Sequence, residues 1–180
     1  MSLRLFAALP VPDEIGQDLK RLQRGVPGAA WRPVENFHIT LRFAGEVDER
    51  KAEDIDSALS EISAAAFDVQ LGGSGHFGGG DPHALWLGVK KSEALNALAA
   101  KCEKACRRAG LKPEGRAFLP HVTIAYLSSA ATLDRVMAFE KREALFVTEP
   151  WRATYFGLFS SITRRNAPSL YRLEAEYPLN

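Results

Sequence analysis

The sequence predicts a fold of mixed strands and helices in which one structural unit occurs twice. Two segments carry the same alternating pattern, Phe-His-Ile-Thr-Leu-Arg-Phe at residues 37–43 and Pro-His-Val-Thr-Ile at residues 120–124. Because a strand turns successive side chains to opposite faces, each segment places a histidine and a threonine on one face and apolar residues on the other. The order strand, helix, turn and His-x-Thr strand also repeats, which indicates an internal duplication. We expect one domain, residues 1–180, made of two pseudo-symmetric lobes.

The first unit opens with residues 3–9, a largely apolar run that is typical of a strand buried on both faces. Asp13 is expected to cap a helix whose apolar residues recur at helical spacing, and Pro27 and Gly28 are expected to end it.

The first His-x-Thr strand follows this helix. His38, Thr40 and Arg42 are expected on its polar face, and Leu41 and Phe43 on the apolar face that covers a core.

The middle of the chain contains a second helix, a glycine-rich segment and the opening of the second unit. Asp48 is expected to cap the second helix. Residues 72–82 are expected to be loop, because they are rich in glycine. A strand over residues 84–89 then precedes a helix that Ser92 caps and Gly110 ends.

The chain after the second His-x-Thr strand contains one more helix and three more strands. Thr132 is expected to cap the helix, which continues through Arg142. Strands are expected over residues 144–148, 151–160 and 170–177.

Composition limits the classes of function. The net charge of +1 argues against the broad basic surface of a nonspecific nucleic-acid binder and leaves room only for a local cationic patch. Cys102 and Cys106 have the spacing of neighbours on one helix face, so we expect reduced thiols in a cytoplasmic protein. The apolar run at the N-terminus ends at Pro10, which predicts a strand and neither a membrane span nor a targeting signal.

The two polar strand faces predict an acid–base site. If the duplicated halves dock about a pseudo-twofold axis, His38 and His121 face each other across a cleft. There one imidazole can deprotonate an attacking water while the other protonates the leaving oxygen, as displacement at phosphorus requires. Thr40 and Thr123 can donate hydrogen bonds to the phosphate oxygens.

Two arginines are candidates for neutralising that phosphate. Arg42 lies one pleat beyond Thr40, and Arg116 shortly precedes the second His-x-Thr strand. An exposed arginine at a strand end can equally be a solvated surface residue.

Metal binding is the rival use of these histidines, with His76 and His83 as further candidate ligands. A zinc site needs three or four ligands in tetrahedral geometry, and no carboxylate adjoins either His-x-Thr pair, so we expect no metal and no cofactor. Phe77 can stack on an RNA base or anchor the glycine-rich loop, and its residue type favours neither role.

Two blocks of sequence resemble a known family. They are Asn-Phe-His-Ile-Thr-Leu-Arg-Phe-Ala-Gly-Glu-Val at residues 36–47 and Arg-Ala-Phe-Leu-Pro-His-Val-Thr-Ile-Ala at residues 116–125. Both are similar to the motif blocks of the two-histidine (2H) phosphoesterases, and within them to the RNA 2′,3′-cyclic phosphodiesterases once called 2′-5′ RNA ligases. Shorter similarities in residues 5–10, 85–89 and 159–173 extend the resemblance over most of the chain.

The resemblance implies a bilobal α+β fold in which two antiparallel sheets line a central cleft with helices on the outside. It implies metal-independent opening of a 2′,3′-cyclic phosphate to a 2′-phosphate, with His38 as proton donor, His121 as proton acceptor, and Thr40 and Thr123 on the phosphate. The implied partner is an RNA terminus, including those of tRNA fragments, and the implied state is a cytoplasmic monomer. From the sequence, the two histidine roles are exchangeable.

One position departs from the family pattern. Many relatives carry an arginine five residues after the second motif histidine, where this chain has Tyr126. We expect that Arg42, Arg116, or Arg164 and Arg165 supply the charge of the missing arginine, or else that the substrate range differs. A non-catalytic module that binds RNA ends and a reversible 2′-5′ ligase remain as alternatives.

Overall fold

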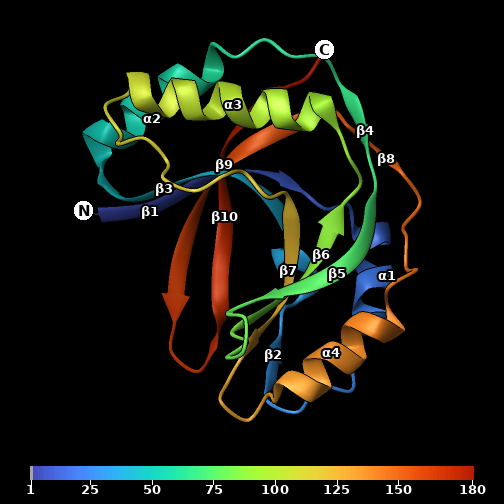
Figure 1. Cartoon of the computed structure of the whole chain (residues 1–180). Coiled ribbons are helices and arrows are strands. Elements are labelled where there is room, and N and C mark those ends of the chain that lie inside the picture. The colour runs from blue at the N-terminus through green and yellow to red at the C-terminus, as the bar shows by residue number, and fades with distance from the viewer. Residues whose placement is uncertain (1) are drawn as a thin grey trace.

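Two four-stranded antiparallel sheets form the centre of the structure, a computed structural model that describes residues 2–180 (Figure 1). The first sheet has the order β10 (Ala167–Pro178), β9 (Tyr155–Arg164), β1 (Ser2–Pro10), β3 (His38–Asp48). The second has the order β2 (Ala29–Trp31), β7 (His121–Leu127), β6 (Ala84–Val89), β5 (Leu71–Phe77). A separate two-stranded ribbon pairs β4 (Phe67–Val69) with β8 (Trp151–Ala153).

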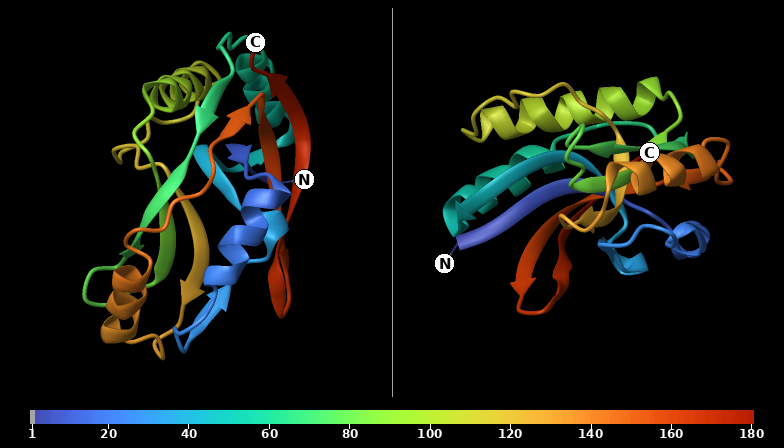
Figure 2. Two further views of the ribbon diagram at one scale, coloured as in Figure 1. Left: turned by 90° about the vertical axis from the view of Figure 1, so that its right-hand side faces the viewer. Right: turned by 60° about the horizontal axis from the view of Figure 1, so that its bottom comes forward.

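Four α-helices pack on the outside of the sheets, as expected for this α+β fold. They are α1 (Asp13–Leu22), α2 (Glu49–Ser60), α3 (Glu93–Arg108) and α4 (Leu133–Arg142), with a 3₁₀ turn, η1 (Val34–Asn36), before β3. Helices α2 and α3 lie side by side at one end of the molecule, and the β9–β10 hairpin projects from the body (Figures 1 and 2). None of the helices in residues 2–180 is long and apolar enough to cross a membrane.

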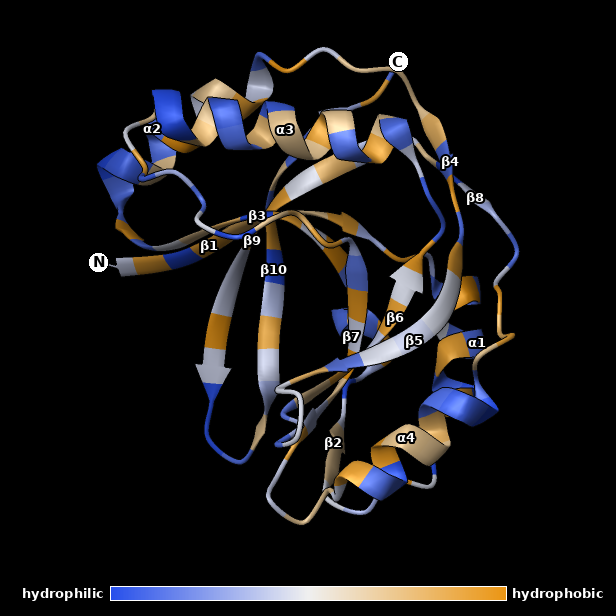
Figure 3. Ribbon diagram, viewed as in Figure 1, coloured by the Kyte–Doolittle hydropathy of each residue, from blue (hydrophilic) through white to orange (hydrophobic). Residues whose placement is uncertain are grey.

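The apolar faces of these elements meet in one connected core. Buried side chains from both large sheets and from all four helices belong to the same hydrophobic cluster. The helices carry hydrophilic residues on their remaining surface, as the bands of colour in Figure 3 show. Burial of one apolar stripe per helix therefore fixes both sheets in a single packed unit.

The helix termini agree only in part with the sequence signals. The side chain of Asp48 accepts a hydrogen bond from the Lys51 amide at 2.8 Å, and that of Ser92 accepts one from Leu95 at 3.2 Å, so both predicted caps are confirmed. Asp13 is not a cap, because it is the first residue of α1. There its carboxylate lies in the first turn, where the helix dipole favours negative charge.

Thr132 occupies the N-cap position of α4, but its side chain makes no capping hydrogen bond. Gly110 follows α3 with φ of +90°, a conformation that glycine adopts without a steric penalty. The predicted end of that helix is confirmed.

The prediction of a loop over residues 72–82 was wrong for its first half. Strand β5 continues to Phe77 and pairs with β6, so only the segment beyond Phe77 turns. A Cβ atom at Gly75 would lie 2.4 Å from the indole ring of Trp86, which faces it on β6. Glycine is needed here for the close approach of two strands, although it is depleted in strands in general.

The C-terminal strands also differ from expectation. Residues 144–148 form no strand, and only an isolated bridge joins Val147 to Gly72. Residues 161–169, between the last two expected strands, are mostly strand themselves, because β9 runs to Arg164 and β10 begins at Ala167. Asn166 has φ of +59°, which closes this long hairpin tightly.

Strand β3 contains a bulge that changes which side chains face the core. Its pairing with β1 shifts between Thr40 and Arg42, so the alternation of faces breaks at Leu41. Arg42 is consequently only 8% exposed, whereas Phe43 is 42% exposed. The prediction that Phe43 packs into the core was therefore wrong.

Candidate active site

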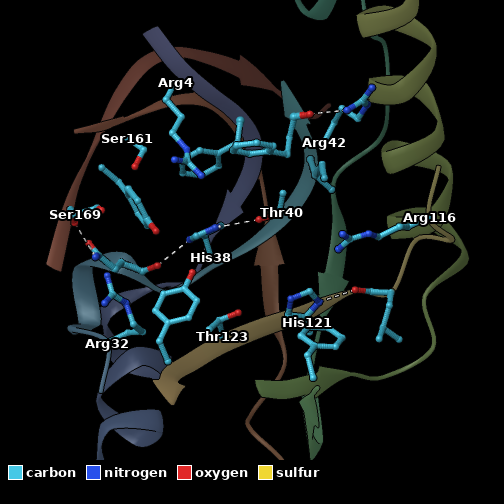
Figure 4. A pocket seen from close by; sticks show the side chains of 18 of the residues that line it. Arg4, Arg32, His38, Thr40, Arg42, Arg116, His121, Thr123, Ser161 and Ser169 are labelled. Carbon is cyan, nitrogen blue, oxygen red and sulfur yellow. Dashed lines mark hydrogen bonds between the residues drawn. The ribbon is translucent and has the colours of Figure 1, made fainter. Parts of the chain in front are cut away.

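A cleft of about 1440 Å³ runs between the two sheets, and both His-x-Thr strands line it (Figure 4). His38 and Thr40 reach it from β3, and His121 and Thr123 reach it from β7. All four side chains are half-buried, because they stand on the solvent side of strands whose other face is packed in the core. The structure thus brings the two sequence motifs together in one cavity.

Each histidine is oriented by its own main chain. His38 Nδ1 lies 2.7 Å from the carbonyl oxygen of Asn36, and His121 Nδ1 lies 2.7 Å from that of Leu119. A carbonyl only accepts, so Nδ1 carries the proton in both rings. In the neutral imidazoles Nε2 is therefore the free base.

The Nε2 atoms differ in their surroundings. His38 Nε2 lies 3.0 Å from the hydroxyl of Thr40, which donates to it while the ring is neutral. His121 makes no such contact with Thr123 among the hydrogen bonds of the described residues.

Burial lowers the affinity of both rings for protons. Desolvation is the main reason why the pKa of His38 falls to about 4, and the nearby His121 and Arg32 lower it further, against the opposing hydrogen bond to Asn36. Desolvation also lowers the pKa of His121, partly offset by its hydrogen bond to Leu119. Both imidazoles are thus available as neutral bases near pH 7 when the cleft is empty.

Aromatic rings surround both histidines and explain this desolvation. The ring centroid of His38 lies 4.8 Å from that of Phe6 and 5.3 Å from that of Tyr171. The centroid of His121 lies 5.0 Å from that of Phe77 and 6.0 Å from that of Trp86. Phe77, at the end of β5, therefore packs beside His121 on the wall of the cleft.

Arg42 is already neutralised within the protein. Its guanidinium forms an ion pair with Glu103, lies 3.7 Å from the carboxylate of Glu114, and donates to the carbonyl oxygens of Phe43 and Lys112. The bulge in β3 turns it toward α3 and away from the two histidines (Figure 4).

The other predicted arginines occupy different parts of the rim. Arg116 is exposed and lies on the His121 side of the cleft in Figure 4. Arg164 lines the cleft from the β9–β10 hairpin, where it donates to the carbonyl oxygen of Pro168 at 2.8 Å. Arg165 lies in the turn of that hairpin and is not part of the lining.

Arg32 lines the cleft beside His38 and was missed by the sequence analysis. It follows β2, a short strand that was not predicted, and its guanidinium carbon lies 5.1 Å from the ring centroid of Tyr126. At Tyr126, where many relatives carry an arginine, a cation is therefore supplied by Arg32, which lies over the ring. The sequence offered no signal for this contact, because it depends on the pairing of β2 with β7.

The remaining histidines are not grouped for metal binding. His76 Nδ1 lies 2.5 Å from the carboxylate of Glu140, and His76 Nε2 lies 2.9 Å from the carbonyl oxygen of Gly79. The hydrogen bond to Glu140 raises the pKa of His76. His83 lines the cleft with its ring centroid 6.4 Å from that of Phe77. Within residues 2–180, no three His, Cys, Asp or Glu side chains are grouped so that they could hold a metal ion.

Comparisons with known proteins agree with this geometry. The model of the 2′-5′ RNA ligase superfamily matches residues 11–158. An RNA 2′,3′-cyclic phosphodiesterase of Archaeoglobus fulgidus is 35% identical over 126 residues, covering 68% of this chain and 71% of the relative. One of Aeropyrum pernix is 33% identical over 146 residues, covering 78% and 83%. A Geobacillus stearothermophilus relative of the same name is 35% identical over 127 residues, 67% of this chain but only 40% of its own length.

Solved structures share the fold at lower identity. LigT of Escherichia coli complexed with 3′-AMP superposes with a TM-score of 0.79 at 24% identity, covering 99% of both chains. TT0787 of Thermus thermophilus superposes with a TM-score of 0.81 at 22% identity, covering 98% of this chain and 97% of its own. These similarities show the fold.

Proposed function

The chain belongs to the 2′-5′ RNA ligase superfamily, and on that premise we propose that it hydrolyses 2′,3′-cyclic phosphate ends of RNA to 2′-phosphates. The observation that carries this proposal is the pair of imidazoles in one cleft, each with a threonine from the same strand face. The similarity to proteins named RNA 2′,3′-cyclic phosphodiesterase supports the same reaction.

The reaction is a displacement at phosphorus. A water oxygen bonds to phosphorus while the bond to the ribose O3′ breaks, and the bond to O2′ is retained. His121 Nε2 accepts the proton of the water, and His38 Nε2 donates a proton to O3′ as it leaves. Each proton transfer of this kind contributes roughly 10²- to 10⁴-fold in rate.

The threonines and Arg116 would stabilise the charge that builds on the phosphate. When His38 is protonated, its Nε2 becomes a donor, so the Thr40 hydroxyl is released to donate to a non-bridging oxygen. Thr123 occupies the corresponding place on β7, and the guanidinium of Arg116 adds positive charge from the rim.

The bound phosphate itself would prepare His38 as an acid. In the empty cleft the pKa of about 4 keeps this ring neutral. An anion placed between the two rings favours the imidazolium form and raises that pKa. His38 would therefore take up its proton chiefly when substrate is present, while His121 accepts one from water.

The size and lining of the cleft favour an RNA end over a mononucleotide. A volume of about 1440 Å³ exceeds the range of roughly 300–1,000 Å³ that is usual for small-ligand pockets. Phe43 and Phe118 are 42% and 38% exposed within its lining and offer faces on which bases can stack. tRNA fragments with cyclic phosphate ends are suitable substrates of this class.

We also propose that the protein is a cytoplasmic monomer. Cys102 and Cys106 are free thiols buried in the core, a state that a reducing compartment preserves. Light scattering after size exclusion would test the monomer, with a dimer as the contrary result.

Two alternatives use the same residues. A non-catalytic module would hold the phosphate with lysine or arginine, which stay charged at any pH, and has no need of two titrating imidazoles. A 2′-5′ ligase runs the same proton transfers in reverse, so its activity would accompany hydrolysis.

The test is hydrolysis of a short RNA ending in a 2′,3′-cyclic phosphate, in excess chelator, with the product isomer identified. We expect turnover to a 2′-phosphate that chelator does not reduce. Binding without turnover would favour the non-catalytic module. Activity lost only in chelator would favour a metal mechanism. A 3′-phosphate product would show that O2′ is the leaving oxygen in place of O3′.

A further inference from the structure

We propose that Arg32 is the cation that binds the phosphate on the His38 side of the cleft, with its guanidinium held in place by the ring of Tyr126. The identity of the anion as a phosphate rests on the proposed function. Arg32, which positions this anion, lies outside both His-x-Thr motifs.

The main chain fixes Arg32 next to the second motif strand. Ala30 of β2 pairs with Tyr126 of β7, and the Arg32 amide donates to the carbonyl oxygen of Ile124 at 2.9 Å. The side chain of Gln23 donates to the carbonyl oxygen of Arg32 at 2.7 Å. Two hydrogen bonds to one residue beyond a strand end hold its backbone in a single position.

The side chain of Arg32 is held in the cleft by an aromatic contact. Its guanidinium carbon lies 5.1 Å from the centroid of the Tyr126 ring, which is within the range of cation–π attraction. A guanidinium carries five N–H groups, so one that lies over a ring retains donors for oxygen ligands.

The field of Arg32 reaches the reacting groups. It is one of the charges that lower the pKa of His38. It also opposes the burial that raises the pKa of Tyr171, whose ring packs against His38. Figure 4 shows Arg32 and His38 on the same side of the cleft, with Arg116 on the opposite side. An anion in contact with His38 would therefore lie within the influence of Arg32.

The other arginines of the cleft are less suited to this task. Arg42 is neutralised by Glu103, Arg164 is bonded to the hairpin tip, and Arg4 lies over Phe43 at 5.3 Å. Arg32 forms no salt bridge with any carboxylate in residues 2–180. Among the arginines that line the cleft, it is also the one whose charge lowers the pKa of His38.

This arrangement couples phosphate binding to the protonation of His38. Without an anion, the positive charge of Arg32 opposes a second positive charge on His38. A phosphate bound between them removes that opposition and favours the imidazolium form. Arg32 would thus hold His38 neutral until the group that needs its proton has arrived.

The first test compares two short RNAs of one sequence, one ending in a 2′-phosphate and one ending in a 2′,3′-diol. We expect the wild type to prefer the phosphorylated end, and Arg32→Met to lose about 10- to 100-fold of that preference, as for a charged hydrogen bond. Arg32→Lys should retain part of it. Arg152→Met removes the same charge from β8, where Arg152 pairs with Asp68, and should leave the preference unchanged.

A second measurement does not depend on turnover. NMR titration of the imidazole carbons should show that Arg32→Met raises the pKa of His38 in the absence of RNA, whereas Arg152→Met does not. Undiminished preference for the phosphorylated end in Arg32→Met, or an unchanged His38 titration, would overturn the proposal.

Moving the guanidinium across the strand pair tests the location of the site. Because β2 and β7 are neighbours, the double variant Arg32→Met/Tyr126→Arg places the charge on the opposite strand of the same cleft wall. We expect it to recover most of the lost preference. A double variant as weak as Arg32→Met would overturn the assignment of both positions to one phosphate site.

These outcomes are separable from the proposed function. Cleavage of the cyclic phosphate by a wild type whose phosphate preference does not depend on Arg32 would leave the reaction intact and reject the inference. Phosphate preference that depends on Arg32, without any cleavage, would do the reverse.

Discussion

His38 and His121 make the same hydrogen bond, from Nδ1 to the carbonyl oxygen two residues earlier, and both distances are 2.7 Å. The two rings therefore share one tautomer, and both Nε2 atoms are left for proton transfer. The difference between them comes from their surroundings, because Arg32 and Thr40 act on His38 alone. Identical local geometry can thus support two different roles.

Removing either imidazole should abolish most turnover and leave the fold intact. His38→Ala and His121→Ala are each expected to lose about 10²- to 10⁴-fold in kcat, since one proton transfer is lost, and neither side chain belongs to the core. Circular dichroism and thermal unfolding would check the fold. Loss of folding in both variants would refute the position of these rings in the cleft.

The leaving group can decide which ring is the acid. A substrate with sulfur in place of O3′ releases a thiolate that needs no proton, so His38→Ala should cleave it far better than the oxygen substrate. His121→Ala should gain nothing from the sulfur. The opposite pattern would exchange the two roles.

The pH dependence should differ between kcat/KM and kcat. The pKa of His38 is about 4 and that of His121 is lowered, so in the free protein the pair carries one proton only on the acidic side of the ordinary imidazole value. We expect kcat/KM to peak below pH ~6.5. In the complex the phosphate raises both values, so the profile of kcat should lie at higher pH. A kcat/KM optimum above neutrality would contradict this.

Stability should fall with acid because of the same burial. The folded pKa of His38 lies below its unfolded value, so unfolded chains bind more protons, and stability is lost as the pH falls from ~6.5 toward 4. At pH 5 this loss is about 2 kcal/mol for an isolated group. His38→Asn keeps an N–H near the Asn36 carbonyl and cannot titrate, so its thermal midpoint should fall less than that of the wild type between pH 7 and pH 5. An equal fall would show that His38 is not responsible.

Arg42 and Arg116 should respond to substitution in different ways. Arg42→Met leaves the Glu103 carboxylate without its partner and two carbonyls without a donor, which should cost about 1–3 kcal/mol of stability. Arg116→Met removes an exposed charge, so it should weaken substrate affinity without changing the thermal midpoint. Midpoint and KM measured for both variants would separate the roles. A lower midpoint in Arg116→Met, or an unchanged one in Arg42→Met, would contradict them.

Part of the site could be predicted because it depends only on local backbone geometry. The alternation of His38 with Thr40 and of His121 with Thr123 follows from the period of a strand, and the structure places all four in one cleft. The caps at Asp48 and Ser92 are local in the same sense, since each side chain bonds an amide three residues away.

Other features depended on partners far away in the chain. The bulge that buries Arg42 arises in the pairing of β3 with β1. The strand at Gly75 arises in the pairing of β5 with β6, where the ring of Trp86 fills the space that a side chain at Gly75 would take. Glycine content and simple alternation predicted the opposite in both cases, because neither contains information about the neighbouring strand.

The pattern of residues was therefore sufficient to predict the two His-x-Thr faces, because a period of two residues is a property of any strand. The surroundings of the two arginines Arg42 and Arg32, by contrast, depend on the tertiary structure. Arg42 is neutralised by Glu103 on α3, and Arg32 reaches His38 through the pairing of β2 with β7. The interaction between two charges depends on their distance in space. Here that distance is set by contacts between residues that lie far apart in the sequence, such as Arg42 and Glu103.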